Sequence, residues 1–312
     1  MITKSCTSDM TKEQWNAERL KSIGGSDAAA LLGLNPYKSA FALWAEKTGE
    51  IKPEDISDRE AVRLGNDLED YVARRFMEAT GKKVRRENHF IFNDAYPFAH
   101  ALPDRMIVGE AAGLECKTTS SWERLKLCRD GEYPKDWYCQ CVHYMMVTGA
   151  QRWYLAVLCF GHGFYYFTIE RDEDEIRALA DAERDFWQHV QDRQPVAVDG
   201  SETTAEAIHT IWADSSDGKG VDLSGVSSAL QEYSYWKDRA DEAKERQNEA
   251  AAQIQSYMMD AERGTCEGYR VSWKTQERAT FDRKKYEAAH GAIPPEYFKK
   301  SSSRPFKVTT IS

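Results

Sequence analysis

PDRMIVGEAAGLECKT, residues 103–118, carries the strongest structural and chemical signal in this chain. Apolar runs at 106–108 and 113–116 flank a turn that contains Gly109, a pattern typical of two adjacent β-strands. The hydrophobic context of the second run predicts that its strand belongs to the core. A core strand seldom needs an acid and a base on one face, so its polar residues favour a chemical role.

Strand geometry places three charged side chains of this segment together. Side chains two residues apart point to the same face, so Glu115 and Lys117 project together while Cys116 points to the other face. Asp104, which follows Pro103, can lie beside Glu115 across the hairpin. Paired carboxylates repel each other unless a cation lies between them, and oxygen ligands beside a lysine suit Mg²⁺ or Mn²⁺ rather than Zn²⁺.

The same residues permit a purely structural interpretation, a turn acid followed by a surface ion pair, because short motifs often match by chance. Two predicted helices favour the chemical one. Glu69 lies on the helix expected at 57–80 and can complete an acidic cluster by facing the sheet. Gln140 and Tyr144, four residues apart on the helix expected at 135–148, share a face and can hold a water or a phosphate oxygen. Each of them alone is equally compatible with an ordinary polar contact.

Composition limits the class of protein. With 41% hydrophobic and 12% aromatic residues, the 312-residue chain has enough apolar material for a core, which excludes global disorder. No apolar run has the length of a membrane span, and MITKSCTSDMTKEQW at the N-terminus lacks the apolar stretch of a secretory signal. Seven cysteines without a CxxC pair indicate a reduced, cytoplasmic protein without structural zinc.

Charge is unevenly distributed. The net charge of −9 argues at first against a nucleic-acid partner. Residues 263–312, however, hold eleven Lys and Arg against five Asp and Glu, which leaves −15 for residues 1–262. Because an acidic cluster that binds cations inverts the local sign, global charge does not exclude DNA.

The order of predicted elements indicates an α/β sandwich with a central mixed β-sheet flanked by helices. Ser26 is predicted to cap the helix at 26–32, and Ser57 with Glu60 forms a capping box for the helix at 57–80. Residues 1–200 are expected to form this main domain. The other predicted helices are 11–20, 39–47, 121–129, 135–148 and 172–192, and the predicted strands lie at 84–116 and 152–170.

The C-terminal part is predicted to be a separate extension. Residues 201–224, rich in Ser, Thr, Gly and Asp, are expected to be a linker. The extension, residues 225–312, begins with one long polar helix at 225–262, whose solvated middle could be half of a helical hairpin. Strands are expected at 269–273 and 306–310.

Taken in order, the motifs G-x-x-x-E, P-D, E-x-K and Q-x-x-x-Y resemble the PD-(D/E)xK nuclease superfamily, in its lambda-exonuclease and RecB-nuclease branch. The segment RLKSIGGSDAAALLGLNPYKSAFALWAEKTG at 19–49 is similar to the opening of YqaJ-type phage recombinases. The C-terminal GYRVSWKTQERATFD and SSSRPFKV resemble the tails of such nucleases. The resemblance covers about residues 15–200 and implies a restriction-endonuclease-like core.

The resemblance implies a role for each matching residue. Asp104, Glu115 and the Cys116 backbone carbonyl would bind Mg²⁺ or Mn²⁺, and Lys117 would work with the attacking water. Glu69 would help with a second metal ion. These assignments come from the family pattern and not from the spacing of the residues.

Further positions match residues around the family's site. Gln140 would contact the metal centre, and Tyr144 is expected on the DNA-binding side with it. Arg19 would receive the 5′-phosphate of the digested strand, with Ser26 close to it. An Arg fork beside a helix N-terminus does form a phosphate pocket. His100 is a further candidate metal ligand, as in RecB-like nucleases.

The implied function is that of a metal-dependent 5′→3′ exonuclease. It would resect double-stranded DNA ends to leave 3′ single strands for phage-type recombination by strand annealing, in the cytoplasm of a bacterial host. Its partners would be DNA ends, a single-strand annealing protein and further copies in a trimeric ring. An endonuclease of the same fold and a non-catalytic DNA-binding assembly protein remain alternatives. No iron–sulfur cluster is expected, since Cys6 and Cys266 flank the domain without a clustered cysteine trio.

Overall fold

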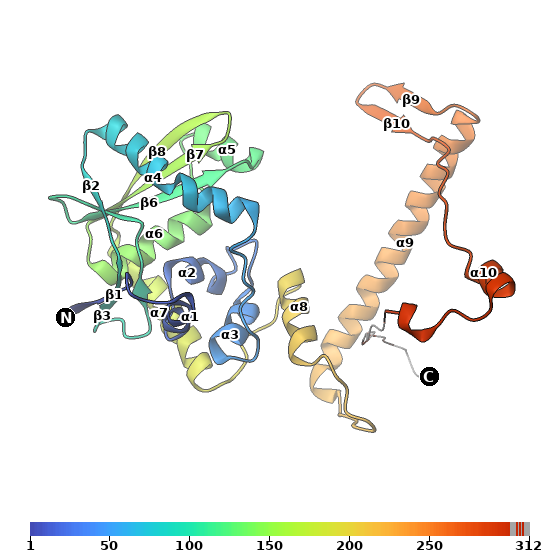
Figure 1. Cartoon of the computed structure of the whole chain (residues 1–312), viewed down its shortest axis with the longest axis horizontal. Coiled ribbons are helices and arrows are strands. Elements are labelled where there is room, and N and C mark those ends of the chain that lie inside the picture. The colour runs from blue at the N-terminus through green and yellow to red at the C-terminus, as the bar shows by residue number, and fades with distance from the viewer. Residues whose placement is uncertain (300–303, 305, 307, 309–312) are drawn as a thin grey trace. The chain divides into compact units, whose positions relative to one another are not determined.

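The computed structural model describes all residues except 300–303, 305, 307 and 309–312 (Figure 1). The chain divides into two compact units, Met1–Trp212 and Ala213–Ser312. The first unit extends past residue 200 because the segment expected to be a linker contains a helix, α8 (Glu202–Ile211). Ser201 caps α8, which packs against α3 (Ala40–Thr48).

A five-stranded mixed sheet forms the centre of the first unit, in the order β2-β5-β6-β7-β8. Neighbouring strands are antiparallel, except for β6 and β7, which are parallel. A parallel pair needs a crossover connection, which α5 (Trp122–Arg129) and α6 (Lys135–Thr148) provide. The expected mixed sheet is therefore confirmed. The strands are β2 (Val84–Arg86), β5 (Arg105–Ile107), β6 (Ala112–Thr119), β7 (Arg152–Cys159) and β8 (Gly163–Glu170).

Helices cover both faces of this sheet (Figure 1). Alternate residues of β7 show how: Tyr154 and Ala156 join the core under α4 (Glu60–Thr80), whereas Leu155 and Val157 join the core under α6. Behind α6 lie α2 (Gly25–Leu31), α3 and α7 (Glu173–Gln191). Because α6 lies between the sheet and these helices, even its polar residues Gln140 and His143 are buried.

A separate three-stranded antiparallel sheet lies beside this core, in the order β1-β3-β4. Its strands are β1 (Ile2–Cys6), β3 (His89–Asn93) and β4 (His100–Ala101). The sequence pattern did not indicate β1, whose residues carry little apolar periodicity. β1 leads into α1 (Lys12–Leu20), which Thr11 and Gln14 begin with a capping box.

Two predicted helix caps are wrong. α2 begins one residue early, after Gly24, whose N–H donates to the carboxylate of Asp27 at 3.1 Å. Ser26 is thereby left exposed for another contact. Ser57 does not cap α4, because its hydroxyl donates to Asp55 at 2.7 Å instead.

The second unit contains the long helix α9 (Ser227–Met258), which confirms the expected helix, although it ends four residues early. In the described part of the chain α9 is followed by a β-hairpin and not by a second long helix. The hairpin consists of β9 (Arg263–Cys266) and β10 (Tyr269–Ser272), and α10 (Arg283–His290) comes after it. The strand expected at 306–310 falls mostly on residues outside the described part. Among the described helices, none combines the length and the apolar character that a membrane crossing requires.

Candidate active site

Glu115 and Lys117 lie on the face of β6 that α6 covers. Their register partners in β7 are Leu155 and Val157, which belong to the core beneath α6. The Lys117 Nζ atom lies 2.7 Å from Glu115 Oε1, and the Glu115 side chain is only 4% exposed. An acid and a base are therefore held together inside the core, as a surface pair would not be.

Gln140 of α6 completes a triangle with these two residues. Its Nε2 donates to Glu115 Oε1 at 2.8 Å, and its Oε1 accepts from Lys117 Nζ at 2.8 Å. The same Nε2 lies 2.9 Å from the hydroxyl of Tyr144, one helical turn further on, and that hydroxyl donates to the Leu102 carbonyl. The amide fixes the positions of both the carboxylate and the ammonium group.

Asp104 reaches the same place from the end of β5. Arg105 pairs with Leu114 across the antiparallel β5–β6 ladder, so Asp104 lies beside the next residues of β6. Its Oδ2 accepts a hydrogen bond from the Cys116 N–H at 2.7 Å. The two catalytic candidates Asp104 and Glu115 thus share one end of the sheet.

Burial sets the protonation of this cluster. It raises the pKa of Asp104 well above its ordinary value, and the charges of Glu115 and Glu69 raise it further. It also raises the pKa of Glu115, although Lys117 opposes this shift. Burial alone would lower the pKa of Lys117, but Glu115 and Asp104 raise it above its ordinary value. Lys117 is therefore a positively charged group at neutral pH and not a free base.

The donor set suits a hard cation. Glu115 Oε2 is buried and has no hydrogen-bond partner in the described residues, and Asp104 brings a second carboxylate to it. A divalent cation would satisfy the unpartnered oxygen and remove the repulsion that raises the pKa of Asp104. Asp104, Glu115 and the Cys116 carbonyl are the groups that would hold it.

Glu69 is placed differently from the other acids. It lies on α4, on the opposite face of the sheet from Gln140, and its carboxylate forms an ion pair with Arg105. Within the described residues, no three carboxylate, imidazole or thiol side chains gather closely enough to form a metal cluster by themselves. Glu69 contributes through its charge, which raises the pKa of both Asp104 and Glu115.

Arg19 and Ser26 lie together at the N-terminus of α2. The Arg19 guanidinium reaches Ser26 Oγ at 3.4 Å and stacks over Trp15, 4.7 Å from the ring centroid. Gly25, between this pair and the carboxylates, has no room for a side chain, because a Cβ atom there would lie 2.6 Å from the Tyr144 ring. The absence of a side chain at Gly25 lets the first turn of α2 lie directly against the Gln140–Tyr144 face of α6.

A buried lysine that no sequence pattern indicated, Lys47, holds the connection between α1 and α2. Lys47, 2% exposed, donates to the backbone oxygens of Arg19 and Ser22, both at 2.7 Å, and forms a 2.7 Å ion pair with Asp27. Burial opposes the ionisation of Asp27, but Lys47 and Arg19 hold its pKa well below its ordinary value. In the sequence Lys47 is one more charge near a helix end, so only its long-range contacts distinguish it.

His100 contacts other groups than the carboxylates. Its Nδ1 lies 2.8 Å from the hydroxyl of Ser22, and burial lowers its pKa to about 3, so the ring is neutral. Its backbone carbonyl accepts from Nε2 of His143, which forms a buried ion pair with Glu183. These histidines connect the helices behind the site.

Among solved structures, an alkaline exonuclease (LHK-Exo) from Laribacter hongkongensis superimposes with a TM-score of 0.50 at 19% identity, covering 59% of this chain and 94% of that one. The same enzyme in complex with dAMP gives a TM-score of 0.50 at 20% identity. The mixed sheet flanked by helices is therefore an exonuclease fold.

Sequence comparison adds the family. The family model of the YqaJ-like viral recombinase domain matches residues 14–151. The uncharacterized protein YqaJ of Bacillus subtilis (strain 168) is 38% identical over 309 residues, which span 98% of this chain and 96% of that protein. The chain belongs to the YqaJ-like viral recombinase family.

The raised pKa of Asp104 predicts how stability depends on pH. With a folded-state pKa above the unfolded one, the folded chain binds more protons between the two values, so its stability falls as pH rises through that window. Asp104→Asn removes the charge and keeps an oxygen for the Cys116 N–H. In metal-free buffer at neutral pH, we expect D104N to raise the free energy of unfolding by on the order of 1 kcal/mol or more.

Denaturant unfolding at several pH values measures this effect. The advantage of D104N should disappear below the unfolded pKa of about 3.9. Asp185→Asn, at an exposed position on α7, is the matched control and should leave stability unchanged. A D104N curve parallel to the wild-type curve over the whole pH range would contradict the raised pKa.

Proposed function

We propose that this chain is a metal-dependent exonuclease that resects double-stranded DNA ends. The observation that carries the proposal is the triangle of the buried Glu115 and Gln140 with the partly buried Lys117, beside Asp104. The exonuclease fold and the viral recombinase family support it. A non-catalytic scaffold would have no need to keep a buried carboxylate beside a second, repelling carboxylate and a charged lysine.

The residues of the site divide the chemistry among them. Asp104, Glu115 and the Cys116 carbonyl would hold Mg²⁺ or Mn²⁺, and Glu69 would help with a second ion. Bound there, the metal would lower the pKa of a water and polarise a phosphate oxygen. Lys117, held charged by its neighbours, orients that water or stabilises negative charge on the phosphate.

Arg19 and Ser26 support the 5′→3′ direction. The guanidinium and the N-terminus of α2 would together bind a terminal phosphate, and Gly25 allows α2 to pack close to Gln140 and Tyr144. A 5′-phosphate held there would present the adjoining part of the same strand to the carboxylates. The product would be a duplex with a 3′ single strand.

The family also supports a place in phage-type recombination. The 3′ strand would be passed to a single-strand annealing protein, and the protein would enclose its duplex as a trimeric ring. The second unit offers exposed aromatic side chains on α9, among them Tyr235 and Trp236, for contact with a partner or a neighbouring subunit.

Nuclease activity should depend on Glu115 and Lys117. We expect Glu115→Gln and Lys117→Ala to reduce digestion of linear duplex by roughly 10²-fold or more with the fold intact, because each removes a group at the reacting phosphate. Lys126→Ala, exposed on α5, is the matched control for the lost charge. Near-normal cleavage by either folded variant would contradict the site.

The purified wild-type chain also allows exonuclease activity to be distinguished from endonuclease activity. An exonuclease digests linear duplex and leaves covalently closed circles intact. If the wild-type chain cuts circles at a comparable rate, the endonuclease alternative is correct.

Arg19 should determine the preference for the chemical end. We expect Arg19→Ala to slow digestion of 5′-phosphorylated duplex by roughly 10- to 100-fold and of 5′-hydroxyl duplex much less, since a charge-assisted hydrogen bond contributes about 1.5–3 kcal/mol. Arg177→Ala, exposed on α7, controls for the loss of positive charge. Equal losses on both ends would assign Arg19 to general affinity or to the fold.

The oligomeric state tests the ring. Light scattering of the whole chain is expected to give three times the mass of one chain. The same measurement on a chain that ends at Trp212 shows whether the second unit is needed for the trimer. A strict monomer at micromolar concentration would exclude enclosure of the duplex, while leaving the nuclease proposal standing.

A further inference from the structure

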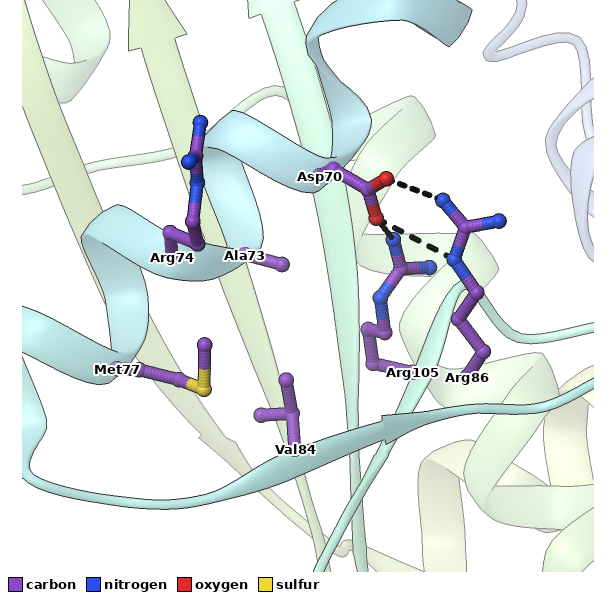
Figure 2. Close-up of a pocket in the computed structure, with 7 residues that line it drawn as sticks. All are labelled: Asp70, Ala73, Arg74, Met77, Val84, Arg86 and Arg105. Atoms are coloured by element: carbon purple, nitrogen blue, oxygen red, sulfur yellow. Dashed lines mark hydrogen bonds and ion pairs between the residues drawn. The ribbon is translucent and has the colours of Figure 1, made fainter.

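A pocket of about 450 Å³ lies between α4 and the edge strand β2 (Figure 2). Its charged lining residues are Asp70, Arg74, Arg86 and Arg105, and Met77 and Val84 form an apolar part of its wall. One lining residue, Arg105, directly follows Asp104 in the chain. None of the steps proposed above uses this pocket.

Two guanidinium groups converge on one carboxylate at the mouth of the pocket. Arg86 reaches both oxygens of Asp70, through Nε at 3.3 Å and through Nη2, and Arg105 Nη2 reaches Oδ1 at 2.5 Å (Figure 2). Three arginines therefore line a pocket that contains a single acid. The pKa of Asp70 is lowered, first by its hydrogen bond to Arg86, so the carboxylate is charged.

The Arg86–Asp70 pair lies in solvent and is replaceable. The Asp70 side chain is 60% exposed and the Arg86 side chain 58% exposed, so the ion pair is weak and another anion can compete for the arginine. A guanidinium that donates from two nitrogens to two carboxylate oxygens has the bidentate geometry that also binds two oxygens of a phosphodiester.

Arg105 is the fixed part of the pocket. Its side chain is 4% exposed, and Nη1 donates to the carboxylate of Glu69 and to the Asp104 carbonyl, the latter at 2.6 Å. The buried guanidinium therefore connects the pocket with Glu69 and with the backbone of Asp104.

The surroundings indicate which anion fits. β2 is the edge of the five-stranded sheet, and Lys83, Arg85 and Arg86 are exposed along it. Val84 and Arg86 face the pocket, whereas Arg85 lies between them in the strand and pairs with Glu87 instead. A guanidinium beside an apolar wall suits a backbone phosphate whose sugar rests on Met77 and Val84. A small free anion would contact the guanidinium groups but not the wall.

We propose that this pocket binds a backbone phosphate of the DNA strand, which replaces the Asp70 carboxylate on Arg86. The inference rests on the proposed function, because it takes DNA as the substrate. Asp70 acts as a competitor that occupies the arginines when no DNA is bound. Charge changes at Asp70 and at Arg86 should therefore alter affinity in opposite directions.

Fluorescence anisotropy of the full-length chain with a labelled duplex, in chelator so that nothing is cut, measures the effect. We expect Arg86→Ala to weaken binding roughly three- to tenfold and to make the dependence of log K on log salt shallower by about one, since one phosphate contact is lost. Arg86→Lys keeps the charge and loses the fork, so it should retain the wild-type slope with intermediate affinity. Asp70→Asn should strengthen binding at least twofold, an estimate based on the removal of one competing charge.

Arg177→Ala, which removes a still more exposed arginine on α7, should change neither quantity. Thermal unfolding must first show that Arg86→Ala is folded. If this variant then has the affinity and the salt slope of the wild type, the inference is overturned, while the nuclease proposal is left intact. Millimolar inorganic phosphate could instead stabilise the wild type but not Arg86→Ala, while both proteins bind the duplex equally well. That result would assign the pocket to a free anion. A wild-type chain that binds no duplex at all would overturn the proposed function itself.

Discussion

The site depends on one buried carboxylate. Glu115 shares a single oxygen with the Lys117 ammonium and the Gln140 amide, and its other oxygen has no partner within the described residues. Such a group is costly to bury unless neighbouring charges compensate for it. Lys117 and the Gln140 amide provide that compensation, and the packing of α6 between the sheet and the helices α2 and α7 places Gln140 against β6.

A second buried charge, Lys47, organises the loop beside the site. It reaches two backbone oxygens and the Asp27 carboxylate, and so it fixes the turn that carries Arg19 and leads into α2. Gly25 leaves no space between the start of α2 and Tyr144, so α2 packs directly on the helix that holds Gln140. Packing rather than sequence proximity thus brings the proposed phosphate-binding and cation-binding residues together.

Local patterns were sufficient for much of the fold. Period-two alternation in 113–117 placed Glu115 and Lys117 on one face, and four-residue spacing did the same for Gln140 and Tyr144, since both periodicities are properties of the backbone alone. Capping was less predictable. Several residues near a helix start can take the N-cap position, and at α2 it is Gly24, whose N–H donates to Asp27, rather than Ser26.

The sequence by itself determined most strands and helices of the first unit and the presence of a carboxylate–lysine motif, because these follow from short-range periodicity; it did not indicate β1 or α8. Only the tertiary structure decided which charges meet. It paired Glu69 with the buried Arg105 while leaving its charge close enough to raise the pKa of Asp104 and Glu115, and it brought Arg86 of β2 to Asp70 of α4. The physical reason is that burial and ion pairing depend on residues far apart in the chain, and no local pattern records which of many equally charged side chains will be enclosed together.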